Sequence, residues 1–210
     1  MCIMRHRGIY KNLQNDRYFY TIWCRLDRSC IPIIRKSLKL IIPYCKWVST
    51  YAETKSDSKN VPHITLRYLG FADKLDKGDI KKDRNKFEKV INDVRLNEIS
   101  VGKFRIWKKY EDRILVKSML NWEIIDNTSL VKIHRELLMI TGYYFFDELE
   151  GENYHPHISL GEINLEEEGN LGKVEKLLEN IKAQKMKFRL ENFAINFADK
   201  GKREEVRLGI

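Results

Sequence analysis

Hydrophobic and polar positions along the chain alternate between a strand-like and a helix-like period. Aromatic and β-branched residues over 18–26 predict a strand, whereas the 3–4 spacing of apolar positions over 77–94 predicts an amphipathic helix. The same criteria predict further strands over 47–51, 61–70, 98–105, 113–118, 154–161, 187–197 and 205–208, and further helices over 27–40, 127–141 and 174–183. A charged turn at 108–112 is expected to join two of these strands as a hairpin.

The order of the expected elements in the first half of the chain is repeated in the second half. No change of composition and no linker rich in Pro, Gly or Ser separates the halves. We therefore expect an α+β protein with a bilobal duplicated fold, in which two antiparallel β-sheets with outer helices surround a central groove. Residues 16–210 are expected to form this single domain, and residues 1–15 a basic N-terminal extension.

Composition excludes several classes of protein. A hydrophobic fraction of 43% and a charged fraction of 33% are typical of a globular chain rather than a disordered one. The longest apolar stretch, 38–45, is too short to cross a bilayer, and no apolar segment follows the basic N-terminus as in a secretory signal. The cysteines lack metal-ligand spacing and are Cys2, Cys24, Cys30 and Cys45. We expect reduced thiols in a cytoplasmic monomer without membrane contact, metal or cofactor, a structural zinc being the alternative for the cysteines.

Positive charge is concentrated near the N-terminus. The formal net charge is +9, and residues 1–60 contain twelve Lys and Arg against four Asp and Glu. Such a segment would attract phosphate groups without reading a nucleotide sequence. The alternative interpretation is a solvated surface that adds only solubility.

Two copies of a short pattern carry the candidate chemistry. The chain reads Pro-His-Ile-Thr-Leu at 62–66 and Pro-His-Ile-Ser-Leu at 156–160, with the two histidines 94 residues apart, close to half the chain length. Because side chains alternate along a strand, the histidine and the hydroxyl residue of each copy share one face. These four residues are His63, Thr65, His157 and Ser159. One copy alone is typical of a structural histidine, but two copies at matching places in a repeat favour a functional pair that faces one cleft.

Two imidazoles and two hydroxyls around one cavity suit phosphodiester chemistry. With a pKa near about 6.5, one histidine can be neutral and accept a proton while the other, as imidazolium, protonates the leaving oxygen. The hydroxyls can donate hydrogen bonds to the phosphoryl oxygens. This pairing of a base with an acid predicts a reaction that needs no metal.

Residues beside the two motifs are candidate substrate ligands. Arg67 shares strand parity with the first motif and could reach a phosphate, and His155 could line the rim of the cleft. Three aromatic residues could stack on a base: Trp47, Tyr68 and Tyr154. A core or groove-wall position is the alternative for each of the aromatic residues. His134 falls inside the helix predicted over 127–141 and is a weaker candidate.

At these residues the chain resembles the two-histidine (2H) phosphoesterase superfamily, most closely the LigT-like branch of RNA 2′,3′-cyclic phosphodiesterases and 2′–5′ RNA ligases. The resemblance runs from residue 18 to the end and includes both motif strands, 63–70 and 154–160, in the order of that family's elements. It implies metal-independent cleavage or transesterification, catalytic roles for the two motif histidines, and phosphate binding by the two motif hydroxyls. The chain departs from the pattern at 161–162, Gly-Glu, where LigT-like chains often have a basic residue.

The expected function is hydrolysis of RNA-type phosphodiesters, with RNA ends or small oligonucleotides and cyclic nucleotides as partners. Candidate substrates are 2′,3′-cyclic phosphate ends and 2′–5′-linked or cyclic oligonucleotides. The segment 147–168 has eight acidic residues and no Lys or Arg, which favours a short ligand over an extended RNA. Open alternatives are a 2′–5′ RNA ligase, a non-catalytic nucleotide-binding module, and a basic RNA-binding protein that works through residues 1–60.

Overall fold

The computed structural model of the protein describes residues 19–49, 62–142, 154–181, 185–199 and 202–209. Its strands are β1 (Phe19–Leu26), β2 (Cys45–Val48), β3 (His63–Phe71), β4 (Glu98–Glu111), β5 (Ile114–Ile124), β6 (His157–Ile163), β7 (Met186–Asp199) and β8 (Lys202–Arg207). Its helices are α1 (Cys30–Leu38), the short 3₁₀ helix η1 (Ile42–Tyr44), α2 (Lys77–Lys82), α3 (Arg84–Val94), α4 (Thr128–Thr141) and α5 (Asn170–Glu179). The α+β class expected from the sequence is confirmed. The basic extension expected over 1–15 lies outside the described residues.

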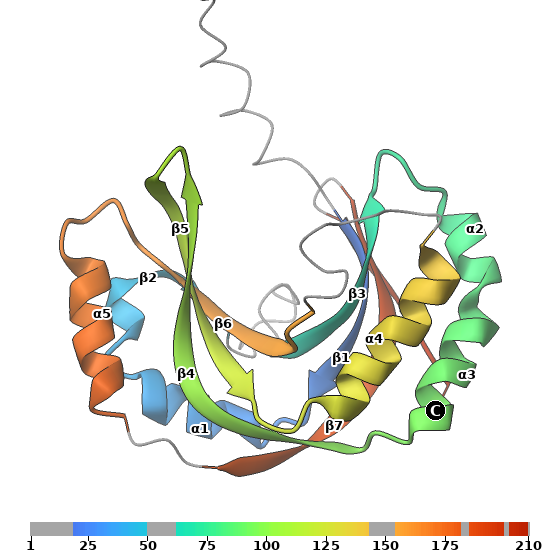
Figure 1. Cartoon of the computed structure of the whole chain (residues 1–210), viewed down its shortest axis with the longest axis horizontal. Helices are drawn as coiled ribbons and strands as arrows, with labels where there is room; N and C mark the ends of the chain where they lie inside the picture. Colours follow the sequence, from blue (N-terminus) through green and yellow to red (C-terminus); the bar gives the residue numbers. More distant parts are fainter. Residues whose placement is uncertain (1–18, 50–61, 143–153, 182–184, 200–201, 210) are drawn as a thin grey trace, which may run out of the picture.

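The eight strands of the described residues form one antiparallel sheet. Their order is β1-β3-β6-β5-β4-β7-β8, with β2 paired to β6 and β1 also paired to β7. The two halves of the fold are connected where β3 meets β6, at Ile64 and Ile158, and where β4 pairs with β7 over Glu98–Val101. In Figure 1 the sheet curves around a central space, with β4 and β5 on one side and β1 and β3 on the other. The expected antiparallel halves are therefore parts of one hydrogen-bonded sheet.

Helices cover the convex side of this curved sheet. α2, α3 and α4 lie outside β1 and β3, and α1 and α5 lie outside the other half (Figure 1). Each of the longer helices buries an apolar stripe, and in α4 the stripe includes Leu130, Ile133 and Leu137. The hydrophobic core therefore lies between the helices and the sheet. The concave side of the sheet is left to carry the polar side chains of the two motifs.

The segment 77–94, predicted as one helix, forms two helices. Asp83 separates α2 from α3 and has φ −85° and ψ 1°. Ile80 in α2 and Phe87 in α3 are both fully buried, so the apolar spacing continues through the break. Hydrophobic periodicity alone therefore does not reveal that the helix is interrupted.

The hairpin of β4 and β5 is present, but its strands are longer than predicted. β4 continues to Glu111 and β5 to Ile124, and the turn consists of Asp112 and Arg113, with φ values of 48° and 66°. Two-residue turns with positive φ match the twist of antiparallel strands. The part of β4 beyond its predicted end is exposed at nearly every position, so no alternation of hydrophobic and polar residues marks it as strand.

Candidate active site

The two motif strands meet at the centre of the sheet. β3 and β6 are antiparallel, with Ile64 opposite Ile158, and both isoleucine side chains are fully buried. Because side chains alternate, the residues on either side of each isoleucine face the concave side. These half-buried residues are His63 and Thr65 from β3, and His157 and Ser159 from β6. Antiparallel register sets each histidine beside the hydroxyl residue of the other motif, on strands about 4.8 Å apart.

A tryptophan ring contacts each motif histidine. On β1, Trp23 lies opposite Thr65, and its ring meets that of His63 at a centroid distance of 4.4 Å. On β4, Trp107 meets the ring of His157 at 4.2 Å. Each half of the fold thus supplies one tryptophan ring to one imidazole, Trp23 from the strand next to β3 and Trp107 from beyond β5. Sequence patterns do not single out either tryptophan, because the contacts depend on strand pairing.

The surroundings of His157 determine its tautomer. Its Nδ1 lies 2.9 Å from the backbone carbonyl oxygen of His155. A carbonyl oxygen can only accept, so Nδ1 carries the proton and Nε2 is left as the acceptor of the ring. Burial lowers the pKa of His157 below the usual histidine value, and the hydrogen bond to His155 offsets this only in part. The imidazole is therefore neutral near pH 7 and can accept a proton at Nε2.

Asn121 on β5 orients the hydroxyl of Ser159. The two residues lie opposite each other in the β5–β6 pairing, and Ser159 Oγ donates to Asn121 Oδ1 at 3.2 Å. The amide nitrogen of Asn121 donates in turn to the carbonyl of Met119 at 3.3 Å, and the asparagine is almost completely buried. Its carboxamide is thus fixed at both ends. Asn121 lies beyond the end of the strand predicted over 113–118, so the sequence pattern does not place it on a strand beside the second motif.

A β-bulge in β3 changes the face of the sheet on which the residues after Thr65 lie. The pairing with β1 shifts by one residue between Thr65, opposite Trp23, and Arg67, opposite Ile22. Arg67 is therefore buried on the helix side, where its Nε donates to Thr141 Oγ1 on α4 at 3.1 Å. The prediction that Arg67 shares a face with the first motif is wrong, because the extra residue of the bulge changes the parity.

Two side chains bond to the carbonyl groups at this bulge. The Tyr154 hydroxyl donates to the carbonyl oxygen of Thr65 at 2.7 Å, and His134 Nδ1 donates to that of Leu66 at 2.7 Å. The rings of His134 and Tyr154 stack at a centroid distance of 3.9 Å and an interplanar angle of 6°. One face of Tyr154, a predicted base platform, is therefore occupied by His134. Its hydroxyl supports the backbone of the first motif.

Replacing Tyr154 by phenylalanine is expected to weaken this support without removing the ring stack. The carbonyl of Thr65 loses its donor, so the free energy of unfolding should fall by about 1 kcal/mol. Urea denaturation of the variant and the wild type measures the difference. Tyr110→Phe, on the exposed part of β4, is the matched control and should leave the midpoint unchanged. A midpoint equal to that of the wild type in Tyr154→Phe would show that this hydrogen bond does not stabilise the fold.

The remaining predicted ligands lie at separate places around the groove. Tyr68 is half-buried, and the bulge turns it to the face of the sheet that carries the first motif. Trp47 on β2 donates through Nε1 to Glu162 Oε2 at 3.4 Å, at the opposite end of β6 from His157. His155 is exposed and lines a pocket of about 260 Å³ that also includes His157. Of these residues, His155 is the one that the structure brings next to a motif histidine.

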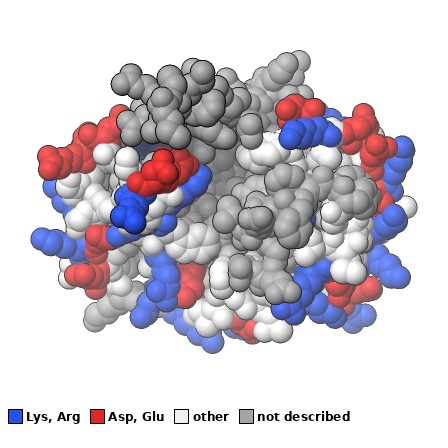
Figure 2. Space-filling model, turned by 45° about the horizontal axis from the view of Figure 1, so that its top comes forward, with Lys and Arg blue, Asp and Glu red and all other residues white. Residues whose placement is uncertain are grey.

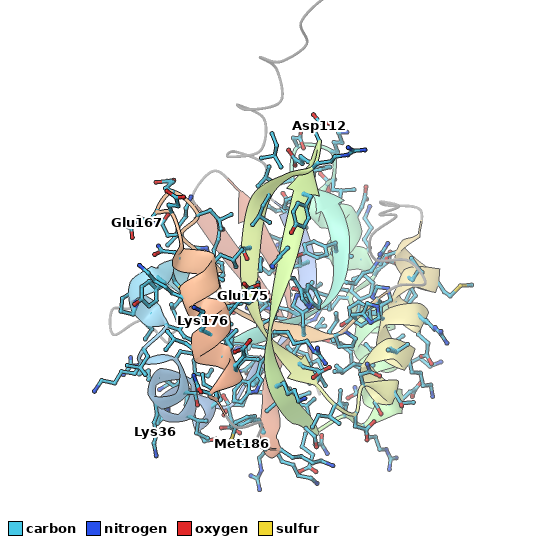
Figure 3. The ribbon with its side chains drawn as sticks, turned by 60° about the vertical axis from the view of Figure 1, so that its left-hand side comes forward. Lys36, Asp112, Glu167, Glu175, Lys176 and Met186 are labelled. Atoms are coloured by element: carbon cyan, nitrogen blue, oxygen red, sulfur yellow. The ribbon has the colours of Figure 1, made fainter. Side chains whose placement is uncertain are left out.

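Charges of both signs lie on the described surface. In Figure 2, Lys and Arg side chains are interleaved with Asp and Glu over the described part of the face shown. Lys46 pairs with Glu166 at 2.9 Å, and Lys108 pairs with Glu175 at 2.7 Å. Figure 3 shows Glu175 on α5, which packs against the β4–β5 hairpin. Within the described part of the acidic segment, Glu166 is paired with Lys46, and Glu162 lies 3.8 Å from Lys117.

The described ranges contain neither a cluster of metal-ligating side chains nor a membrane-spanning helix. No three His, Cys, Asp or Glu side chains gather there closely enough to hold a metal ion. No helix of the described chain is both long enough and apolar enough to span a bilayer. Cys24, Cys30 and Cys45 are free thiols, and Cys2 lies outside the described residues.

The sequence identifies the family over most of its length. The profile of the 2'-5' RNA ligase superfamily matches residues 43–198, a range that contains both Pro-His-Ile motifs. The chain therefore belongs to the 2'-5' RNA ligase superfamily, whose members are two-histidine (2H) phosphoesterases. A search of curated proteins finds no match.

Solved structures of low sequence identity resemble this fold. A structure of Usb1 from Kluyveromyces marxianus with uridine monophosphate is 12% identical, with a TM-score of 0.50, and the match covers 91% of this chain and 98% of that one. Another structure of the same Usb1 is 11% identical, with a TM-score of 0.49 and coverage of 91% and 97%. A structure described as a phosphoesterase is 11% identical, with a TM-score of 0.48 and coverage of 92% and 97%. These likenesses concern the fold alone.

Proposed function

We propose that the protein is a metal-independent phosphodiesterase that hydrolyses RNA-type phosphodiesters by acid–base catalysis with His63 and His157. The observation that carries this proposal is the antiparallel pairing of Ile64 with Ile158, which brings both motifs to one face of the sheet. Membership in the 2'-5' RNA ligase superfamily supports the same chemistry. A phosphate over this pair of strands would have an imidazole on each side and a hydroxyl beside each imidazole.

His157 is the base of the proposed reaction and His63 the acid. Nε2 of His157 takes a proton from the attacking water while the water oxygen bonds to phosphorus. The bond between phosphorus and the leaving ribose oxygen breaks, and the imidazolium of His63 gives that oxygen a proton. A 2′,3′-cyclic phosphate thereby opens to a phosphomonoester, and proton exchange with solvent returns both rings to their starting states.

The two hydroxyls act on the phosphoryl oxygens. Thr65 and Ser159 donate hydrogen bonds to the non-bridging oxygens, where negative charge increases in the transition state. Without substrate, the single hydroxyl proton of Ser159 goes to Asn121 Oδ1, so it turns from Asn121 to a phosphoryl oxygen when the substrate binds, while Tyr154 holds the backbone of Thr65. Asn121 and Tyr154 fix the positions of Ser159 Oγ and of the Thr65 backbone, so the site needs little reorganisation beyond this rotation of one hydroxyl hydrogen.

The proposed substrates are short. They are 2′,3′-cyclic phosphate ends, 2′–5′-linked oligonucleotides or cyclic oligonucleotides. The pocket of about 260 Å³ beside His157 suits one nucleoside better than a long strand. On the described part of the face in Figure 2, Lys and Arg are interleaved with Asp and Glu, which disfavours an extended polyanion there.

A substrate panel tests the proposal. Oligonucleotides with 2′,3′-cyclic, 2′–5′ and 3′–5′ linkages and cyclic dinucleotides are incubated with the protein and a chelator, and products are resolved by chromatography. Hydrolysis of a 2′,3′-cyclic or 2′–5′ substrate with chelator present is the expected result. Joining of 2′,3′-cyclic to 5′-hydroxyl ends would instead support the ligase. Binding in calorimetry with no product from any substrate would contradict catalysis and support a binding module.

The pH dependence of kcat/KM follows from the lowered pKa of His157. A general base must be neutral, and burial moves this group's pKa below the usual value of 6.5. Activity should therefore persist as the pH falls through about 6.5 and decline only below it. A profile of kcat/KM against pH for a 2′,3′-cyclic substrate measures the midpoint of the acidic limb. An acidic midpoint above 6.5 would contradict the assignment of His157 as the base.

A further inference from the structure

The pocket beside His157 has a lining that suits a flat ligand with polar edges. Its volume of about 260 Å³ lies just below the range of roughly 300–1,000 Å³ that is typical of small-molecule sites. β4, β5 and the start of α4 supply its walls through Arg105, Trp107, Glu123 and Asn127. This size and lining suit one ring system better than an oligonucleotide.

Trp107 exposes a large aromatic surface at this pocket. Its side chain is 41% exposed, although its ring contacts that of His157. Trp23, which contacts His63 in the equivalent way, is only 2% exposed. Tryptophan is usually well buried in folded proteins. The difference between the two tryptophans leaves Trp107 with an open surface that an aromatic ligand can cover.

Polar groups surround this open surface. Arg105 and Glu123 form an ion pair at 3.1 Å on neighbouring strands, and together offer donors and an acceptor at the pocket. Asn127 is at the N-cap position of α4, but its side chain makes no capping hydrogen bond within the described residues. Its carboxamide can therefore donate to and accept from a ligand in the pocket.

We infer that this pocket is a nucleobase subsite, in which the base of the substrate stacks on Trp107 and its edge bonds to Arg105, Glu123 and Asn127. The inference rests on the proposed function, since the contact between Trp107 and His157 sets the base beside the reacting phosphate. Stacking tolerates any base, whereas the polar edge requires hydrogen-bonding atoms on the ligand. A ligand with the phosphate but no base would leave this pocket empty.

Two substrates that differ only in the base test the subsite: adenosine 2′,3′-cyclic phosphate and ribose 2′,3′-cyclic phosphate. Trp107→Ala should raise KM for the adenosine substrate by about 5- to 100-fold through lost stacking and leave KM for the ribose substrate unchanged. Trp107→Phe keeps an aromatic face and should recover most of the loss. Tyr110→Ala, an exposed aromatic residue of the same strand outside the pocket, is the matched control. Equal losses on both substrates, or no loss on either, would overturn the subsite.

Binding of adenosine 3′-monophosphate separates this inference from the proposed function. In calorimetry, Trp107→Ala should bind this nucleotide about 5- to 100-fold more weakly than the wild type. If the wild type cleaves no substrate but this weakening is found, the phosphodiesterase is overturned and the subsite stands. If the wild type cleaves substrate and both proteins bind the nucleotide equally, the subsite is overturned and the phosphodiesterase stands.

Discussion

Alanine at either His63 or His157 is expected to reduce kcat for 2′,3′-cyclic phosphate hydrolysis by about two to four orders of magnitude. In the proposed mechanism each variant loses one proton transfer, because His157 accepts from the attacking water and His63 protonates the leaving oxygen. Steady-state turnover with chelator present measures both losses. KM should change much less, since the hydroxyl groups proposed to contact the phosphate remain in place.

Folding of these two variants is checked separately, because each imidazole packs against a tryptophan ring. The urea midpoint of each variant is compared with that of the wild type. Met139→Ala, at a side chain 85% exposed on α4, is the control variant and should retain wild-type turnover. A folded histidine variant with turnover within about threefold of the wild type would remove that histidine from the mechanism.

Loss of either hydroxyl beside the phosphate is expected to lower kcat by about a hundredfold. Thr65→Val keeps the β-branched shape and Ser159→Ala removes a single oxygen, so both strands should keep their pairing. The developing charge on the phosphoryl oxygens then lacks one donor. The steady-state assay used for the histidine variants measures the loss.

Asn121→Ala separates the presence of the Ser159 hydroxyl from its orientation. This variant keeps the hydroxyl but removes the carboxamide oxygen that holds it, so a smaller loss of kcat than in Ser159→Ala is expected. Wild-type kcat in both folded hydroxyl variants would show that neither Thr65 nor Ser159 acts on the phosphate.

Much of the fold follows from local patterns. α4 occupies 128–141, against a predicted range of 127–141, and β1 occupies 19–26, against 18–26. α4 has a clear period because one face packs against the core, whereas β1 is buried at nearly every position and is recognisable by its aromatic and β-branched residues. The shared face of histidine and hydroxyl in each motif follows from the same strand alternation, which is why the four candidate residues could be chosen from the sequence.

The features that the sequence does not predict depend on pairing between distant strands. The bulge in β3 adds one residue against β1 and turns Arg67 into the core, and no local pattern marks that extra residue. Trp23 reaches His63 because β1 pairs with β3, and Trp107 reaches His157 from β4 across β5, the strand that pairs with β6. Asn121 meets Ser159 for the same reason, in a part of β5 that continues beyond its predicted end.

If both imidazoles act on one phosphorus atom in one step, the hydrolysis rate of the double variant His63→Ala/His157→Ala follows from the rates of the two single variants. Single-turnover rates of 2′,3′-cyclic phosphate hydrolysis are measured for the wild type, each single variant and the double variant. Groups that act as a unit give non-additive effects, so the double variant should lose little more than the slower single variant. Independent groups would multiply their effects, so that two losses of about a thousandfold would become about a millionfold. A multiplied loss would contradict a shared phosphorus atom, and a double variant as slow as the slower single variant is the predicted result.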